Sequence, residues 1–157
     1  VSRAPGVEAE ALAPLAAAGV EVVESSLFAE LRRSHVAVVC SGTATVEAAL
    51  SRTPHVIVYR TGALSYAIAR RLARVEHIGM ANIVLGRRAF PELLQRELTP
   101  AAIAQRVSAL FLGSGDARRR QLEDCEALVR ALGAPGCFDR VAALALDELH
   151  TPPAAAV

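Results

Sequence analysis

Two uninterrupted apolar runs, Val36–Cys40 and Val56–Tyr59, constrain most strongly what this chain can fold into. A strand that is apolar at every position is buried on both faces, as in a parallel sheet covered by helices. The pattern around these runs is helical, over about Leu27–Arg33, Ala44–Ser51 and Leu64–Arg74. The alternation predicts an α/β protein: a Rossmann-like parallel sheet with helices on both faces.

The flanking sequence extends this pattern less regularly. Glu8–Ala18 is predicted as a helix that stops at Gly19, and Val20–Val23 as a short strand. Ile78–Leu85 is predicted as a strand and loop, and Pro91–Leu94 as a brief helix.

The C-terminal part is predicted to be helical. Thr99 caps a helix that has Pro100 in its first position and runs to about Leu112. Two more helices follow, to about Leu132 and over Phe138–Leu149. We therefore divide the chain into a partial Rossmann-like domain, residues 1–112, and a helical segment, residues 113–157, that packs on this domain or on a partner.

The start of the chain departs from the usual doubly wound pattern. Such domains open with a strand and a glycine-containing phosphate loop, whereas this chain opens with loop-like sequence and a helix. We therefore expect the first βα unit to be missing.

Composition excludes several classes of function. Apolar residues make up 53% of the 157 residues, the net charge is +1, and no apolar run approaches a membrane span. The three cysteines, at positions 40, 125 and 137, lack the spacing of a disulfide framework or a zinc site, so we expect no metal. We also expect no cofactor. Every basic residue other than histidine is Arg, so an anion site must use guanidinium or backbone groups.

The segment after the first buried strand has the order needed to hold an anion. Ser41-Gly42-Thr43 lies between a strand and a helix, and Gly42 lets a ligand approach the backbone. The unpaired N–H groups of the first helical turn favour negative charge. Ser41, Thr43 and Thr45 add hydroxyl groups, and ligands of open α/β sheets sit at this end of the strands. The GK[ST] ending of a P-loop is absent.

Glu47 lies one residue beyond the position that a capping box would give it. Its carboxylate can accept hydrogen bonds from ribose hydroxyls one turn behind a phosphate site. On spacing alone, a solvated residue on an exposed helix face is the favoured explanation.

Five blocks of sequence resemble the lipid-A-disaccharide synthase family in order and spacing. They begin at Ser41 and end at Gln95: Ser41–Leu50, Val56–Arg60, Tyr66–Leu72, Ile78–Ile83 and Pro91–Gln95. The resemblance covers residues 1–112 well and the later helices loosely. It implies the C-terminal half of a GT-B inverting glycosyltransferase that moves 2,3-diacylglucosamine from UDP to 2,3-diacylglucosamine 1-phosphate and releases UDP without a metal.

Residue by residue, the resemblance implies a UDP-donor site. It assigns Ser41, Gly42, Thr43 and Thr45 to the diphosphate and Glu47 to the ribose. It further assigns Asn82 to a loop near the donor, where Ala81 replaces the usual Pro, and Gln95 to the cleft. Arg60 follows the third predicted strand, where its guanidinium could meet a phosphate. The catalytic acidic residue belongs to the N-terminal domain, which this sequence lacks.

The resemblance also implies partners and a location. It suggests peripheral attachment at the inner face of the cytoplasmic membrane and a homodimer with exchanged C-terminal segments. Arg70, Arg71 and Arg74 share one side of the predicted helix Leu64–Arg74 and could meet anionic lipid, or could form an ordinary solvated face. Few aromatic residues accompany the Arg residues, which argues against nucleic-acid binding.

Two alternatives remain open at this point. One is another UDP-sugar GT-B transferase or an epimerase, which would keep the diphosphate segment without the Tyr66–Leu72 and Asn82–Gln95 blocks. The other is a truncated, non-catalytic module that binds UDP without turnover.

Overall fold

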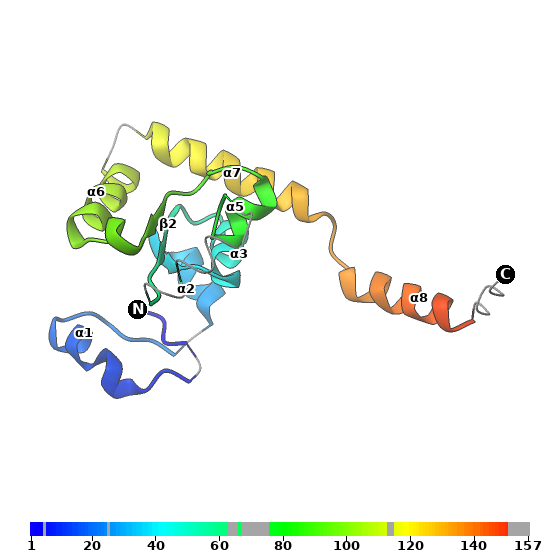
Figure 1. Ribbon diagram of the computed structural model, residues 1–157, viewed down its shortest axis with the longest axis horizontal. Coiled ribbons are helices and arrows are strands. Elements are labelled where there is room, and N and C mark those ends of the chain that lie inside the picture. The colour runs from blue at the N-terminus through cyan, green and yellow to red at the C-terminus, as the bar shows by residue number, and fades with distance from the viewer. Residues whose placement is uncertain (5, 25, 63–65, 67–75, 113–114, 151–157) are drawn as a thin grey trace.

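The computed structural model describes residues 1–4, 6–24, 26–62, 66, 76–112 and 115–150 (Figure 1). At its centre is a parallel sheet in the order β1-β2-β3, formed by Ala37–Cys40, His55–Tyr59 and Glu92–Leu94. The helical elements are η1 (Ala9–Leu12), α1 (Ala13–Ala17), α2 (Leu27–Arg33), α3 (Thr43–Leu50), α5 (Met80–Leu85), η2 (Gln95–Glu97), α6 (Pro100–Phe111), α7 (Asp116–Leu132) and α8 (Cys137–His150).

Helices pack on both faces of the sheet, which confirms the predicted fold class. On one face, β2 meets α3, α5 and α7 in a cluster of buried side chains: Ala49, Ile57, Ala81, Phe90, Cys125 and Leu128. On the other face, Val56 and Leu93 pack against Leu110 of α6. Val56 and Ile57 are neighbours in β2 and point to opposite faces, because side chains alternate along a strand.

Several predicted elements are confirmed. Helix α2 has the predicted bounds, and α3 begins one residue before the predicted Ala44. The Thr99 side chain caps α6 by accepting a hydrogen bond of 3.2 Å from the Ala102 N–H. The predicted helix Leu64–Arg74, with Arg70, Arg71 and Arg74, lies outside the described residues except for Tyr66.

Two predictions about residues 78–94 are wrong. Met80–Leu85 is the helix α5 rather than a strand and loop, and Glu92–Leu94 is the strand β3 rather than a helix. Partners from distant parts of the chain explain the first difference. The Glu92 carboxylate accepts hydrogen bonds from the backbone N–H groups of Ile78 and Gly79 at the start of α5, and the Thr45 hydroxyl accepts one from the Ala81 N–H.

The predicted burial of Val36–Cys40 on both faces is also wrong. Within β1 only Val39 is buried, whereas 47% of Val38 is exposed and Cys40 is exposed. The reason is position, because β1 is an edge strand of this sheet and its outer side has no neighbour among the described strands.

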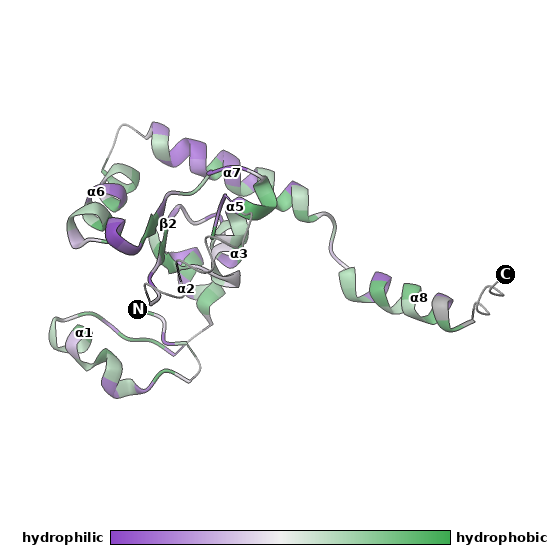
Figure 2. Ribbon diagram, viewed as in Figure 1, coloured by the Kyte–Doolittle hydropathy of each residue, from purple (hydrophilic) through white to green (hydrophobic). Residues whose placement is uncertain are grey.

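The two ends of the chain lie apart from this body (Figure 1). Near the N-terminus, the predicted strand Val20–Val23 is reduced to a parallel bridge between Ser2 and Val23. At the other end α7 packs on α3, α5 and α6, whereas α8 projects away from the body and is apolar along much of its length (Figure 2).

Candidate functional site

The carboxyl ends of the three strands bring together the loops that the sequence singled out. Cys40 pairs with Val58 and Tyr59 pairs with Leu94, so these residues are the last in their ladders. Continuing this register places Gly42, Arg60 and Gln95 one row beyond the sheet. This is the edge at which open α/β sheets bind their ligands.

Gly42 gives the turn after β1 its shape. It has φ of 143° and ψ of −163°, a conformation that residues with a side chain rarely adopt. A Cβ on Gly42 would meet no atom of the described residues within 4 Å, so on this side the turn is open toward them. The turn therefore requires glycine for its backbone conformation and leaves room for a ligand against the chain.

The first turn of α3 supplies backbone donors beside Gly42. Thr45 N–H bonds to Gly42 O at 3.2 Å, whereas the N–H groups of Thr43 and Ala44 have no bond within the described part of the chain. Unpaired donors at a helix N-terminus carry partial positive charge and favour anions. Thr43 is exposed, and the Ser41 hydroxyl, which is half-buried, donates to Ile78 O at 2.9 Å.

Thr45 is turned inward, although it shares the helix with Thr43. Its side chain is fully buried. Its hydroxyl donates to Gly42 O at 2.8 Å and accepts from the Ala81 N–H at 3.2 Å. This hydroxyl therefore joins the Gly42 turn to the start of α5. Because both of its hydrogen bonds are made within the protein, its role here is structural.

Glu47 lies one turn further along α3 and is half-buried. Within the described residues its carboxylate makes no hydrogen bond or ion pair, so no structural partner accounts for it. Its assignment to a ribose stays a prediction.

Arg60 and Gln95 meet at the same edge. The Arg60 guanidinium donates through Nη2 to Leu98 O at 3.1 Å and to Gln95 O at 3.3 Å, which ties the end of β2 to η2. Gln95 has φ of 48°, and its buried Nε2 has no hydrogen-bond partner among the described residues. Arg60 is exposed, so its remaining N–H groups are open to solvent.

Asn82 is buried behind this edge. Its Nδ2 donates to Phe90 O and to Glu92 Oε1, both at 2.8 Å, and its Oδ1 accepts from the Phe90 N–H at 2.9 Å. These bonds occupy the amide within the protein. Asn82 thus holds α5 against the segment that leads into β3.

Glu92 and Gly79 contribute to this region, and the sequence analysis did not identify either. Only 3% of Glu92 is exposed, and its carboxylate accepts hydrogen bonds from the Gly79 N–H at the start of α5 and from Asn82 Nδ2. Gly79 has no room for a side chain, because a Cβ would collide with Ile57 and lie 3.1 Å from Glu92 Oε1. An acidic residue inside the apolar run Phe90–Leu94 was the available signal, whereas the sequence analysis took Pro91 as the start of a helix.

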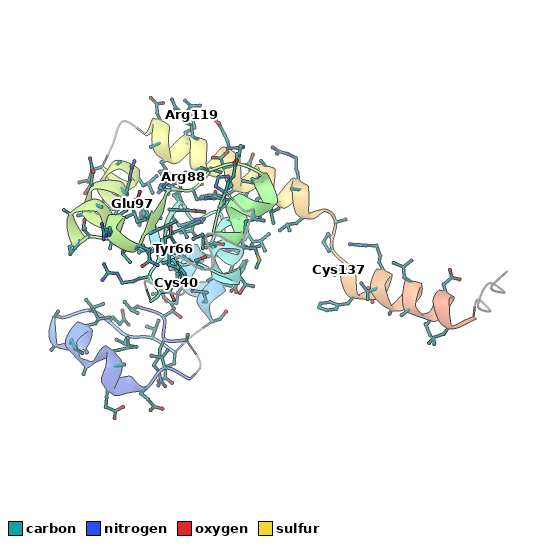
Figure 3. All side chains as sticks on the ribbon, viewed as in Figure 1. Cys40, Tyr66, Arg88, Glu97, Arg119 and Cys137 are labelled. Atoms are coloured by element: carbon teal, nitrogen blue, oxygen red, sulfur yellow. The ribbon has the colours of Figure 1, made fainter. Side chains whose placement is uncertain are left out.

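Together these groups form an edge with open hydrogen-bond donors above a buried polar layer. The open groups lie at the Ser41–Thr43 turn, the α3 N-terminus and Arg60. The buried layer consists of Thr45, Asn82 and Glu92. Cys40, which Figure 3 labels, is the last residue of the strand that leads into this turn. No three His, Cys, Asp or Glu side chains gather as metal ligands among the residues the structure describes. No described helix is long and apolar enough to cross a membrane.

Comparison with known proteins identifies the family. Residues 14–142 match the family model described as lipid-A-disaccharide synthetase. The chain is 41% identical over 128 residues to a lipid-A-disaccharide synthase of Syntrophus aciditrophicus, covering 82% of this chain and 33% of the relative. It is 40% identical over 146 residues to that of Anaeromyxobacter dehalogenans, covering 90% and 38%.

A third relative, the lipid-A-disaccharide synthase of Acidobacterium capsulatum, is 47% identical over 109 residues, covering 69% of this chain and 27% of the relative. The chain thus spans about a third of the length of these curated relatives. Since the family model matches most of its residues, the chain belongs to the lipid-A-disaccharide synthetase family.

Proposed function

We propose that this chain forms the donor-binding part of a glycosyltransferase of lipid A biosynthesis. In this proposal the complete enzyme transfers 2,3-diacylglucosamine from UDP to 2,3-diacylglucosamine 1-phosphate at the inner face of the cytoplasmic membrane. Membership of the family supports the reaction class. The observation that carries the site is Gly42, whose glycine-only conformation opens the turn at the N-terminus of α3.

The diphosphate would lie against the Ser41–Thr43 turn. The free N–H groups of Thr43 and Ala44 and the hydroxyl of Thr43 would donate to its oxygens, with Arg60 at the next strand end. Fixed donors of this kind stabilise the negative charge that develops on departing UDP. Thr45 and Asn82 would hold these donors in place, since their own polar atoms are already bonded within the protein.

Titration calorimetry with UDP tests this site. Gly42→Ala should weaken UDP binding by at least about tenfold, because alanine disfavours this conformation and its methyl group occupies the open side. Gly86→Ala is the matched control: Gly86 ends α5 with φ of 63° and also has open space around it. Gly86→Ala should cost stability without weakening binding, and equal UDP affinities in all three proteins would contradict the proposal.

The alternative is a module that binds UDP without turnover. Measuring sugar transfer after adding the rest of a relative's chain separates this alternative from the enzyme. A donor-binding part should bind UDP alone and support transfer only when combined with the remaining two thirds of a relative. Sugar transfer by this chain alone would contradict its assignment to one part of the enzyme.

We further propose that α8 is exchanged between two copies of the protein. This is supported by the large exposed fractions of its apolar side chains, including Phe138 at 88%, Leu149 at 80% and Leu144 at 66%. Sedimentation velocity should show a dimer, and Leu144→Glu with Leu149→Glu should shift it to monomer. A monomer at every protein concentration, or a dimer that the two substitutions leave unchanged, would contradict the exchange.

A further inference from the structure

The Ser41 hydroxyl is bonded within the protein, although Ser41 belongs to the open turn. It donates to Ile78 O at 2.9 Å, while the Ser41 N–H donates to Val58 O at 3.0 Å. A serine hydroxyl has a single proton to donate. As long as this proton is shared with Ile78, it is not available to an oxygen of a bound diphosphate.

The peptide group between Ile78 and Gly79 connects this hydroxyl to a buried carboxylate. Its oxygen accepts from Ser41, and its N–H, which is that of Gly79, donates to Glu92 Oε1 at 2.9 Å. The Ile78 N–H also donates to Glu92, at 3.3 Å from each carboxylate oxygen. Hydrogen bonds in a chain polarise and strengthen one another. The hydroxyl, the peptide group and the carboxylate therefore act as one unit.

Close packing fixes the place of this peptide group. Gly79 is buried, and a Cβ on it would collide with the Ile57 side chain and lie 3.1 Å from Glu92 Oε1. Glu92 itself is 3% exposed and pairs with Ile57 in the ladder between β2 and β3. The main chain at Gly79 therefore rests directly on the sheet and gives the Ser41 hydroxyl an acceptor in a fixed position.

The turn is attached to the same segment on both sides of Gly42. The residue before Gly42, Ser41, bonds to the segment just ahead of α5. After Gly42, the Thr45 hydroxyl donates to Gly42 O at 2.8 Å and accepts from the Ala81 N–H at 3.2 Å. Helices α3 and α5, which pack side by side, are thus joined near their N-terminal ends through the turn (Figure 1).

The unpaired N–H groups of Thr43 and Ala44 lie between these two attachments. Donors that are already held in direction bind an anion with a smaller loss of conformational entropy than donors that become ordered on binding. The attachments therefore bear on the affinity of the turn for a diphosphate, although neither hydroxyl needs to contact it.

We propose that Ser41 is a positioning residue of the donor site. Its hydroxyl keeps its bond to Ile78 O when UDP binds and, with Glu92 behind that peptide group, fixes the direction of the Thr43 and Ala44 N–H groups. This inference rests on the proposed UDP site and changes the role of one residue in it. Ser41 supports the diphosphate through the turn, and direct contact is left to the other groups of the site.

Titration calorimetry with UDP over a double-mutant cycle tests the connection. Ser41→Ala removes the hydroxyl, and Glu92→Gln keeps the shape of the side chain but removes its charge. Each variant should bind UDP about three- to tenfold more weakly, because one hydrogen bond of the unit is lost or weakened. The double variant should bind no more weakly than the weaker single variant, since both changes act on one unit. Losses that multiply, or unchanged affinity in Ser41→Ala, would overturn the proposal.

Thr53→Val is the control for a loss of stability alone. The buried Thr53 hydroxyl donates to Leu31 O at 2.7 Å, beyond the end of α3 that is opposite the Gly42 turn. Thr53→Val should unfold at lower urea concentration and keep the UDP affinity of the parent chain. If its affinity falls as far as that of Ser41→Ala, the effect of Ser41 reflects stability and the positioning role is wrong.

Gly42→Ala separates the failure of this inference from the failure of the proposed function. If Gly42→Ala leaves UDP affinity unchanged, the site itself is wrong, and the role of Ser41 fails with it. If Gly42→Ala weakens binding while Ser41→Ala does not, the site stands and only the positioning role is overturned.

The NMR signal of the Ile78 carbonyl carbon tests Ser41 without altering Glu92, so it does not depend on whether Glu92→Gln folds. Ser41→Ala gives the chemical shift of this carbon when the bond is absent. Saturating UDP should leave the Ile78 signal of the parent chain in place, while it shifts the N–H signals of Thr43 and Ala44. Movement of the Ile78 signal toward its Ser41→Ala value would mean that the hydroxyl turns to the diphosphate, which would overturn the proposal.

Discussion

Thr43 and Thr45 lie two residues apart in α3 but differ in burial and in hydrogen bonding. Thr43 is exposed beside the open Gly42 turn, whereas Thr45 is fully buried with its hydroxyl bonded to Gly42 O and Ala81 N–H. Glu47 and Glu92 repeat the contrast. The first has no partner among the described residues, and the second accepts bonds from Gly79 N–H and Asn82 Nδ2.

The difference shows that one cluster of polar residues serves two purposes. At the open turn, the N–H groups of Thr43 and Ala44 have no bond among the described residues and Thr43 is exposed, whereas the Ser41 hydroxyl donates to Ile78 O. The polar atoms of the buried layer, Thr45, Asn82 and Glu92, form hydrogen bonds with α5 and with the segment that leads into β3. Substitutions in the buried layer should therefore act on stability, and substitutions near the open turn should act on binding.

The largest effect is expected at Asn82. Asn82→Ala leaves the Phe90 backbone and the Glu92 carboxylate without a partner in a buried site, so the free energy of unfolding should fall by about 3 kcal/mol. Urea denaturation measures this change. Thr43→Ala, at the exposed position, should cost less than about 0.5 kcal/mol. Similar losses in the two variants would remove the distinction between layer and turn.

The sequence predicted the open turn well and the buried layer poorly. A strand followed by Ser-Gly-Thr and a helix is a local pattern, so β1, the turn and α3 followed from neighbouring residues. The order of α5 and β3 depends on bonds between residues such as Thr45 and Ala81, or Glu92 and Gly79, that are distant in sequence. Periodicity does not contain such bonds, so the apolar sequence of Met80–Leu85 resembled a strand.

The exposed edge of β1 was missed for a related reason. The apolar sequence of Val36–Cys40 indicates the environment of a complete sheet, whereas exposure of Val38 depends on which strands are present. The sequence pattern therefore indicates the burial that an interior strand has, whereas β1 lies at the edge of the described sheet.

His55 extends the comparison to a buried group that titrates. Its ring stacks on Phe90 with centroids 4.1 Å apart, Nδ1 lies 2.9 Å from Thr53 O, and Nε2 has no partner among the described residues. Burial lowers the pKa of His55 from 6.5 to about 4. The unfolded chain therefore binds the proton more readily, and stability should be lost as the pH falls through this range.

The expected loss between pH 6.5 and pH 4 is about 2–3 kcal/mol of unfolding free energy. Urea denaturation across this range, compared with His55→Leu, isolates the contribution, because carboxylates titrate in both proteins. His35→Gln is the control, since His35 is exposed. If His55→Leu keeps the full pH dependence of the parent chain, the buried histidine is not its source.

The smallest effect on stability is expected at Glu47. A substitution there should therefore separate an effect on UDP binding from an effect on stability most clearly. Without a partner in the described structure, Glu47→Gln should change the free energy of unfolding by less than about 0.5 kcal/mol. If its carboxylate accepts from the ribose hydroxyls, UDP should bind about three- to tenfold more weakly, since a hydrogen bond to a charged group is lost. Uracil binding, which involves no ribose, provides the matched comparison. A variant with unchanged UDP affinity would place Glu47 among the solvated residues of α3, and the open turn would then hold the diphosphate without a carboxylate behind it.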